Sequence, residues 1–368
     1  MVQNVLFITT GLLKGGAETQ LIKIARFLNS KDYKVCIVSL KPINDFNIDF
    51  KSEGLEVVFL NTWFTKPVSN CINLCRTVSA FKPDVVIAFM FISIIFARFL
   101  KMWFKFQLIS SIRTPVIANK WYSLFKLTAD WDDVIVYNSH KSKSNFEKNK
   151  LVKKAGLVLN NAITLPELSL TKKLTLEKQP FVWISMAHFV PEKDYQTLFK
   201  AIALIKEKNF RVDILGNLFQ QEWPAEVINQ LGIANRVRLL GLKTDTSIYL
   251  KEADGFVLSS FLEGMPNALL EAMAFHKPVI ASAVDGIEEL LENIDCGFLF
   301  KQGDEKELAE KMTEMMKMSV AKREALGKNG RKHIQMYFSE EKVFQDWKSL
   351  IDQLAVKRKA SLSGSLSH

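Results

Sequence analysis

The chain has 368 residues, enough for two domains, and its 48% hydrophobic and 24% charged residues are those of an ordinary globular protein, which excludes a disordered chain. The net charge of +10 lies entirely in residues 1–170, which hold 22 basic and 12 acidic residues, whereas residues 171–368 hold 27 of each. A basic half favours an anionic partner there: a phosphorylated ligand, nucleic acid or a membrane surface.

The first predicted element is a buried strand, NVLFITT, close to the start of the sequence. The opening residues lack the basic n-region and the small-residue cleavage site of a signal peptide, so we expect a cytoplasmic protein. The cysteines agree with a reducing compartment, because they show neither CxxC spacing nor pairing with histidine. They are Cys36, Cys71, Cys75 and Cys296.

A glycine-containing turn, GLLKGG, follows this strand and leads into a predicted helix, AETQLIKIARFLN. Leu21, Ile24, Ala25 and Leu28 share one face of that helix. Further strands are predicted at KVCIVSL, LEVVFL, DVVIAF, QLISSI and DVIVYNS, with helical or mixed segments between them. This alternation is typical of a parallel α/β sheet.

One segment of the first half departs from the alternation. Residues 89–106, FMFISIIFARFLKMWFKF, are strongly apolar, and Arg98, Lys101 and Lys105 lie in the second half of the segment. The segment has no uncharged run of 18 residues, so a membrane-spanning helix is not expected. Two interpretations remain open: a helix of the domain core, or a basic aromatic face that dips into an anionic membrane surface.

Residues 164–180 are mostly polar, contain two prolines and are predicted to link two domains. Beyond them, short apolar strands are predicted at FVWISMA, RVDILG, RVRLLG, GFVLSS, PVIAS and GFLF, alternating with helical stretches such as YQTLFKAIALIKEKN and PNALLEAMAFH. The chain is therefore predicted to form two parallel-sheet α/β domains, with ligands at the carboxyl ends of the strands.

The stretch EGMPNALLE places two carboxylates around the start of a predicted helix. Gly264 permits a sharp turn, and Pro266 or Asn267 suits the first helical positions. The N–H groups at a helix start form a ready anion site. Glu271, about one turn inside the helix, leans back toward the turn that holds Glu263. The pair suits a ligand with phosphates, a sugar and a ribose; solvated or helix-capping glutamates are the alternative.

These motifs resemble one family over nearly the whole chain: the GT-B glycosyltransferases of the retaining family 4 type. The resemblance runs from GLLKGGAETQ through KPDVVIAF, NSHKSKSNF, MAHFVPEKDYQTLFKAIA and VRLLGLKTD to ADGFVLSSFLEGMPNALLEAMAFHKPVIASAVDGIEELL, and ends in GFLF and YFSEEKVFQDW. It implies an α/β fold of two Rossmann-like, doubly wound parallel-sheet domains facing a central cleft. We expect an acceptor domain at residues 1–168, a nucleotide-sugar domain at 169–341, and a helix at about 342–356 that packs back on the first domain.

The resemblance also implies a donor site, mostly on the second domain. Glu271 would accept hydrogen bonds from the ribose hydroxyls, and Glu263 from hydroxyls of the donor sugar. The backbone N–H groups of Gly264 to Ala268 would stabilise the charge that develops on the leaving diphosphate, and Lys193 would add a positive charge. Catalytic roles are expected for Glu263, Lys193 and His188. The implied donor set is Gly15, Gly16, His188, Lys193, Leu242, Glu263, Gly264, Met265, Pro266, Asn267, Ala268 and Glu271.

Three positions depart from the family pattern. His188 stands where an arginine is usual; a neutral imidazole can donate one hydrogen bond to a phosphate oxygen but lacks the fixed charge and the bidentate fork. Phe89 stands where many relatives have a histidine near the reacting sugar, so that catalytic histidine cannot be carried over. Asp285 replaces the first glycine of a usual pair, and a structural consequence is expected.

Arg113 and Asn138 follow predicted strands and are candidate contacts for the acceptor, with contact to the donor left open as the alternative. The remaining histidines give no metal-ligand spacing, and no DxD motif stands at a suitable strand end, so neither a metal nor another cofactor is expected.

We therefore expect a retaining glycosyltransferase that moves a hexose or N-acetylhexosamine from a nucleoside diphosphate sugar, with UDP the first choice of nucleotide, to a hydroxyl of a glycan or lipid-linked acceptor in cell-surface polysaccharide synthesis. It is expected to act in the cytoplasm or on the inner face of the plasma membrane, bound to anionic lipid, and nucleic acid is not an expected partner. Two alternatives stay open: a sugar-nucleotide epimerase of the same fold, and a non-enzymatic basic module that binds membrane or nucleic acid.

Overall fold

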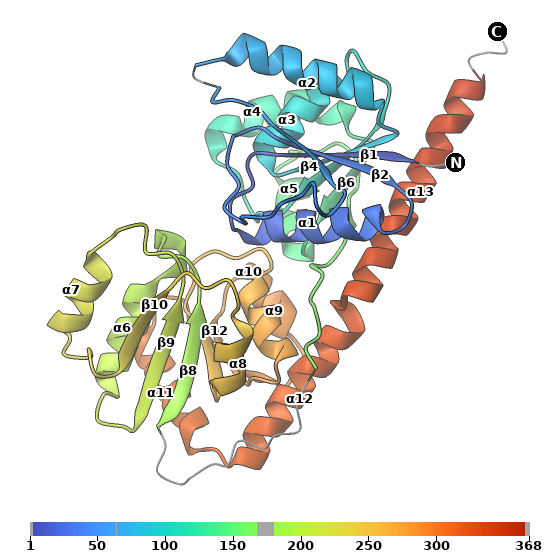
Figure 1. Cartoon of the computed structure of the whole chain (residues 1–368). Helices are drawn as coiled ribbons and strands as arrows, with labels where there is room; N and C mark the ends of the chain where they lie inside the picture. Colours follow the sequence, from blue (N-terminus) through green and yellow to red (C-terminus); the bar gives the residue numbers. More distant parts are fainter. Residues whose placement is uncertain (1–2, 64, 168–179, 365–368) are drawn as a thin grey trace. The chain divides into compact units, whose positions relative to one another are not determined.

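The structure of the protein is a computed structural model that describes residues 3–63, 65–167 and 180–364 (Figure 1). Its contacts divide the chain into two units: unit 1 is Met1–Ala162 with Glu341–His368, and unit 2 is Ile163–Glu340. The predicted domain boundary, between 168 and 169, and most of the predicted linker lie outside the described residues.

Unit 1 contains a seven-stranded sheet in which neighbouring strands pair in parallel, in the order β3-β2-β1-β4-β5-β6-β7 (Figure 1). The inner strands are buried along nearly their whole length, because helices cover both faces of the sheet. The strands are β1 (Asn4–Thr9), β2 (Lys34–Ser39), β3 (Glu56–Phe59), β4 (Val85–Phe89), β5 (Gln107–Ile112), β6 (Val134–Tyr137) and β7 (Leu157–Val158).

Two hydrophobic cores lie on the two faces of this sheet. On one face, α1 (Gly16–Asn29) packs together with α13 (Glu340–Gly364), whose Trp347 and Ile351 are fully buried. On the other face lie α2 (Pro67–Phe81), α3 (Phe91–Leu100), α4 (Tyr122–Leu127) and α5 (His140–Lys148). Two short 3-10 turns, η1 (Asn119–Trp121) and η2 (Ala129–Trp131), flank α4.

Unit 2 contains a six-stranded parallel sheet in the order β10-β9-β8-β11-β12-β13 (Figure 1). Its strands are β8 (Phe181–Met186), β9 (Phe210–Leu215), β10 (Val237–Gly241), β11 (Gly255–Leu258), β12 (Val279–Ser282) and β13 (Gly297–Phe300). The strand order reverses between β8 and β11, which is the arrangement of a doubly wound sheet. The predicted fold class, two parallel α/β sheets, is confirmed.

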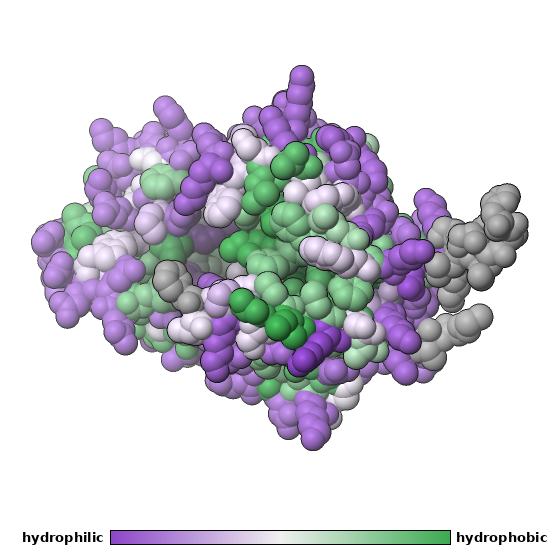
Figure 2. Space-filling view, turned by 90° about the horizontal axis from the view of Figure 1, so that it is seen from above, coloured by the Kyte–Doolittle hydropathy of each residue, from purple (hydrophilic) through white to green (hydrophobic). Residues whose placement is uncertain are grey.

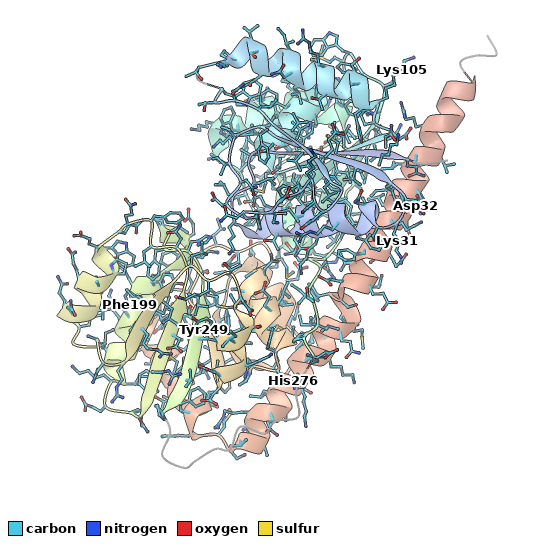
Figure 3. The ribbon with its side chains drawn as sticks, viewed as in Figure 1. Lys31, Asp32, Lys105, Phe199, Tyr249 and His276 are labelled. Atoms are coloured by element: carbon cyan, nitrogen blue, oxygen red, sulfur yellow. The ribbon has the colours of Figure 1, made fainter. Side chains whose placement is uncertain are left out.

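Helices also cover both faces of the unit 2 sheet. One core contains α8 (Ser247–Glu252), α9 (Asn267–Ala274), α10 (Asp285–Leu291) and α12 (Val320–Tyr337). The opposite core contains α6 (Tyr195–Leu204), α7 (Trp223–Gln230) and α11 (Glu305–Lys317), and the turn η3 (Pro191–Lys193) precedes α6. Phe199 of α6 is fully buried in this second core, where its ring lies 6.2 Å from that of Trp223 (Figure 3).

Candidate active site

The candidate site lies at the carboxyl edge of the unit 2 sheet, where the strand order reverses. From β8 the chain continues to β9 on one side, and it later returns to β11 on the other side. In a doubly wound sheet, the loops that follow the two strands at this reversal form the ligand site. Here the loop after β8 carries His188 and Lys193, and the loop after β11 carries Glu263.

Lys193 and Glu263 form an ion pair across these two loops. Nζ of Lys193 donates to Oε1 of Glu263 at 2.6 Å, and the same oxygen accepts a hydrogen bond from Oγ of Ser260 at 2.7 Å. Glu263 is 9% exposed, and its other oxygen, Oε2, has no hydrogen-bond partner within the described ranges. One oxygen is therefore anchored, and the other can accept a hydrogen bond from a ligand hydroxyl.

Buried serines hold the loop that carries Glu263. Oγ of Ser259 donates to the carbonyl oxygen of Asp194 at 2.9 Å, and Oγ of Ser282 donates to the carbonyl oxygen of Ser260 at 2.6 Å. The loops after β8, β11 and β12 are thus joined by neutral hydrogen bonds. Ser260 and Ser282 are missing from the predicted site, and the sequence marks them only as serines at strand ends.

Gly286 brings the start of α10 against the Glu263 loop. Its N–H donates to the carbonyl oxygen of Glu263 at 3.2 Å, and a Cβ at this position would lie 1.9 Å from the carbonyl oxygen of Gly264. No side chain fits in that space. Asp285, the residue that departs from the family pattern, is the first residue of α10, where a negative charge favours the helix.

The helix predicted from NALLEAMA is α9, which begins at Asn267 with Pro266 as its N-cap. Gly264, Met265 and Pro266 are buried, whereas Asn267, Ala268 and Glu271 are half-buried. The two glutamates thus lie before the helix and in its second turn, as predicted from their spacing. That the backbone N–H groups bind a diphosphate, and Glu271 a ribose, stays a prediction.

His188 is held in one orientation by the loop that follows β9. Its Nδ1 accepts a hydrogen bond from the N–H of Asn217 at 3.1 Å, which places the proton of a neutral imidazole on Nε2. A Cβ on Gly216 would lie 1.8 Å from the carbonyl oxygen of Ala187, so the two loops need a glycine to approach this closely. Phe219, with a left-handed φ of 51°, packs its ring at 5.7 Å from the imidazole. The sequence prediction missed this loop, whose signal is the glycine after the strand RVDIL.

Leu242, another predicted donor contact, follows β10 and is 46% exposed. The residue before it, Gly241, has a φ of +70°, which favours glycine at the strand end. The structure thus places Leu242 at the carboxyl edge of the same sheet, two strands from β8.

The predicted glycines of unit 1 form the start of α1. Gly15 is the N-cap and Gly16 the first residue of the helix. The carboxylate of Glu18 lies over this turn, since a Cβ on Gly15 would be 2.9 Å from its Oε2. Burial raises the pKa of Glu18 from 4.5 to about 7. Glu18 is absent from the predicted site, although its place at the start of a helix after two glycines marks it.

Arg113 and Asn138 each follow a strand of the unit 1 sheet directly, β5 and β6 respectively, and Phe89 is the last residue of β4. All three are buried, and the guanidinium of Arg113 lies 5.2 Å from the ring centre of Phe89. The structure therefore brings the two predicted acceptor contacts to one edge of the sheet.

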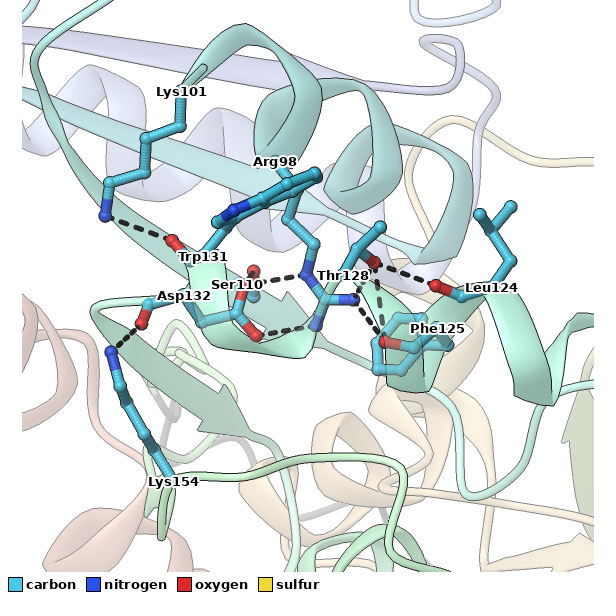
Figure 4. A network of polar contacts seen from close by, with 9 residues as sticks. All are labelled: Arg98, Lys101, Ser110, Leu124, Phe125, Thr128, Trp131, Asp132 and Lys154. Carbon is cyan, nitrogen blue, oxygen red and sulfur yellow. Dashed lines mark hydrogen bonds and ion pairs between the residues drawn. The ribbon is translucent and has the colours of Figure 1, made fainter.

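The structure corrects the membrane interpretation for part of residues 89–106. Arg98 on α3 is fully buried, and its Nε and Nη2 donate to the two carboxylate oxygens of Asp132 at 2.8 and 2.6 Å (Figure 4). Nζ of Lys101 donates to the carbonyl oxygen of Trp131 at 3.0 Å and pairs with Asp133. Arg98 thus belongs to the domain core and cannot contact a membrane, because its charge is already paired inside the protein.

Within the described ranges, no group of three or more His, Cys, Asp and Glu side chains is placed to hold a metal ion. The same part of the chain contains no helix whose length and apolar character would let it cross a membrane. Independence of a metal stays a prediction.

Residues 168–333 match the family model of glycosyl transferases group 1. An uncharacterized glycosyltransferase of Methanocaldococcus jannaschii is 25% identical over 347 residues, which span 79% of this chain and 84% of that protein. The capsular polysaccharide biosynthesis glycosyltransferase CapM of Staphylococcus aureus is 26% identical, over 60% of each chain. Several other relatives match over only about half of their own length.

Solved structures share the fold over almost the whole chain. The structure of HepE from Anabaena, in complex with UDP and glucose, superimposes with a TM-score of 0.81 and covers 95% of this chain and 99% of that one. Its sequence identity is 18%, so the likeness concerns the fold. It extends to both units, whereas the family model covers unit 2 from residue 168 onward.

Proposed function

Because the chain is a group 1 glycosyltransferase with the GT-B fold, we propose that it is a retaining enzyme of family 4 that uses a nucleoside diphosphate sugar, with UDP as the nucleotide. It transfers a hexose or N-acetylhexosamine to a hydroxyl of a glycan or lipid-linked acceptor in cell-surface polysaccharide synthesis. The names of relatives support this role, since CapM acts in capsular polysaccharide biosynthesis and HepE was crystallised with UDP and glucose. The match to a family of enzymes also argues against the alternative of a non-enzymatic basic module that binds membrane or nucleic acid.

The observation that carries the proposal is the Lys193–Glu263 pair at the carboxyl edge of the unit 2 sheet. Oε2 of Glu263 accepts a hydrogen bond from a hydroxyl of the donor sugar, while Oε1 stays anchored to Lys193 and Ser260. Lys193 donates one of its three N–H groups to Glu263 and keeps two for oxygens of the diphosphate. One ion pair thus positions the sugar and stabilises the charge on the leaving group.

His188 and the backbone N–H groups at the start of α9 provide the remaining hydrogen bonds to the diphosphate. The Nε2–H of His188 provides one neutral hydrogen bond, since Nδ1 is occupied by the N–H of Asn217. The acceptor hydroxyl attacks the anomeric carbon on the face from which the diphosphate leaves, and a diphosphate oxygen takes up its proton. Retention therefore needs no carboxylate nucleophile, in contrast to a retaining glycosidase.

The proposal includes adsorption to an anionic membrane through unit 1. Lys105 is exposed at the edge of this unit (Figure 3), and Met102 and Trp103 beside it are 56% and 69% exposed. Seen from above, from the side on which α2 lies in Figure 1, apolar residues gather among charged ones (Figure 2). Each basic residue near an anionic leaflet contributes about 1 kcal/mol, screened over about 8 Å, so adsorption is reversible.

A panel of nucleotide sugars in a thermal-shift assay, followed by turnover with and without acceptor glycans, tests the donor proposal. A nucleotide sugar at 100-fold its Kd should stabilise the folded protein by about 2.7 kcal/mol. Lys193→Ala should lose this stabilisation, whereas the exposed Lys208→Ala should keep it. EDTA should leave turnover unchanged. Failure of every nucleotide sugar to bind would refute the proposal, and epimerised product without transfer would identify an epimerase.

Liposome flotation tests the membrane part separately. Trp103→Ser combined with Lys105→Glu should release the protein from anionic vesicles, whereas Lys31→Glu, in the exposed turn after α1, should not (Figure 3). Neutral vesicles should bind neither variant nor the original protein. Equal flotation of all three proteins with anionic vesicles would rule out this surface.

A further inference from the structure

Unit 1 buries two arginines whose surroundings differ. Arg98 donates four hydrogen bonds, two of them to the carboxylate of Asp132 (Figure 4). Arg113 is 9% exposed and has only neutral acceptors: Oγ of Ser111 at 2.9 Å, the carbonyl oxygen of Leu159 at 3.4 Å and Oδ1 of Asn161 at 3.2 Å. Within the described residues no carboxylate pairs with Arg113. A buried cation without a counter-charge is unfavourable for folding, so its presence calls for another explanation.

Three buried polar atoms in this region have no hydrogen-bond partner among the described residues. They are Nη2 of Arg113, Oδ1 of Asn138 and Nε1 of Trp347. The three residues are neighbours: the guanidinium of Arg113 lies 5.5 Å from the Trp347 ring, and the side-chain amide of Asn138 donates to the backbone carbonyl oxygen of Arg113 at 3.5 Å. Buried polar groups in folded proteins are nearly always paired, so three in one place indicate a missing partner.

The position of these atoms in the fold is that of a ligand site. Phe89, Arg113 and Asn138 end or follow β4, β5 and β6, three adjacent strands of the parallel sheet. They therefore share its carboxyl edge, and β4 is one of the two strands between which the order of this sheet reverses. Trp347 reaches this edge from α13, and its ring lies 6.3 Å from that of Phe89.

We propose that Arg113, Trp347 and Asn138 form a subsite for an oxyanion of the acceptor, either a phosphate or a carboxylate. Nη2 of Arg113 and Nε1 of Trp347 donate to the anion, and Asn138 accepts from a neighbouring hydroxyl. The aromatic rings of Phe89 and Trp347, beside the guanidinium, exclude water and strengthen these charge-assisted bonds. This inference rests on the proposed transferase function and adds the chemical class of acceptor: a lipid-linked phosphate or an acidic sugar.

Arg113 has the charge that this role requires. Burial lowers the pKa of its guanidinium to about 9, and the group is therefore still a cation at neutral pH. Binding of an anion would supply the missing counter-charge.

Titration calorimetry with inorganic pyrophosphate and with glucuronate tests the subsite and separates the two sources of anion. We expect one of the two anions to bind, and Arg113→Met to weaken that binding at least tenfold, whereas Arg76→Met, which removes an exposed arginine of α2, leaves it unchanged. Arg113→Lys should retain part of the affinity. Pyrophosphate binding that is lost only in Lys193→Ala belongs to the donor site and would overturn the inference.

Two further measurements distinguish anion binding by Arg113 and Trp347 from a purely structural role of these residues. Arg113→Met should melt at the same temperature as the original protein or higher, because it removes an unpaired buried charge. Trp347→Phe keeps the ring and removes only the Nε1 donor, so it should lower affinity for the anion several-fold. If neither anion shows binding that depends on Arg113 and Trp347, the three atoms bind ordered water and the inference is wrong. If the original protein bound no nucleotide sugar at all, that result would instead count against the proposed function.

Discussion

Replacing Gly286 by alanine would place a methyl group against the loop that carries Glu263. The Cβ would lie 1.9 Å from the carbonyl oxygen of Gly264 and 2.8 Å from that of Glu263, whereas real Cβ contacts are essentially never shorter than 3.0 Å. Both contacting atoms belong to backbone, so no side-chain rotation can relieve the clash. Either α10 or the Glu263 loop must therefore move by about 1 Å.

The size of the expected effect follows from this displacement. A shift of about 1 Å in a group that positions substrate costs roughly 100-fold in turnover. Overpacking of a well-packed region costs about 1–3 kcal/mol of stability. In the variant, the displacement also disturbs the hydrogen bond from the N–H of residue 286 to the carbonyl oxygen of Glu263, which is 3.2 Å long in the original protein. The variant should thus fold, bind free nucleotide through Glu271, and lose most of its transfer activity.

Donor turnover and thermal melting, measured together, check this reasoning. Gly330→Ala is the matched control: it adds the same methyl group to α12 of the same unit, where the nearest side-chain atom, Cβ of Cys296, is 3.3 Å away. The control should keep its turnover. Gly286→Ala with wild-type turnover would refute the claim that this glycine positions Glu263.

Four other substitutions test the remaining assignments. If Glu271 holds the ribose, Glu271→Ala should weaken the binding of free nucleotide by roughly 1.5–3 kcal/mol, measured by calorimetry; unchanged affinity would show that Glu271 does not bind the ribose. Lys193→Ala should reduce turnover more than His188→Ala, because the lysine has three N–H groups to donate whereas the histidine, whose Nδ1 accepts from Asn217, has only Nε2–H; the reverse order would contradict this. Arg98→Met should lose about 3–5 kcal/mol in urea denaturation, since it leaves a carboxylate buried and unpaired, whereas an unchanged midpoint would mean the pair is not buried. The raised pKa of Glu18 means that the unfolded chain releases this proton first, so stability should fall as pH rises from 4.5 to about 7, and Glu18→Gln should flatten that slope in melting curves.

The sheets could be predicted because a parallel sheet covered on both faces needs continuous apolar strands, such as NVLFIT and FVWISM. The strand β7 escaped prediction because it has only two residues, Leu157–Val158, and neither is fully buried. The nature of residues 89–106 could not be decided from composition. Arg98 belongs to the core because it pairs with Asp132. The sequence does not reveal this pairing, because the two residues are 34 positions apart.

The sequence predicts which residues line the candidate site, but it does not predict which of them pair with one another. The glycines, Pro266 and two glutamates fix a turn and a helix start, which are local features. Lys193 and Glu263 are 70 residues apart, and their ion pair arises only where two loops meet at the sheet edge. For the same reason the sequence indicates Arg113 as a residue after a strand but cannot show that it lacks a counter-charge.

The path of the chain between the units has a consequence for biosynthesis. Unit 2 is inserted into unit 1, because residues 163–340 separate the seven-stranded sheet from α13, which completes its core. The ribosome therefore synthesises the sheet before unit 2, and it adds Trp347 and Ile351 of α13 only after unit 2 is complete. Of the two units, unit 1 is thus the later to fold although its sheet is synthesised before unit 2, and its apolar face is exposed to chaperones throughout synthesis of unit 2. Nascent chains stopped after residue 340 should resist protease in unit 2 and be cleaved in unit 1.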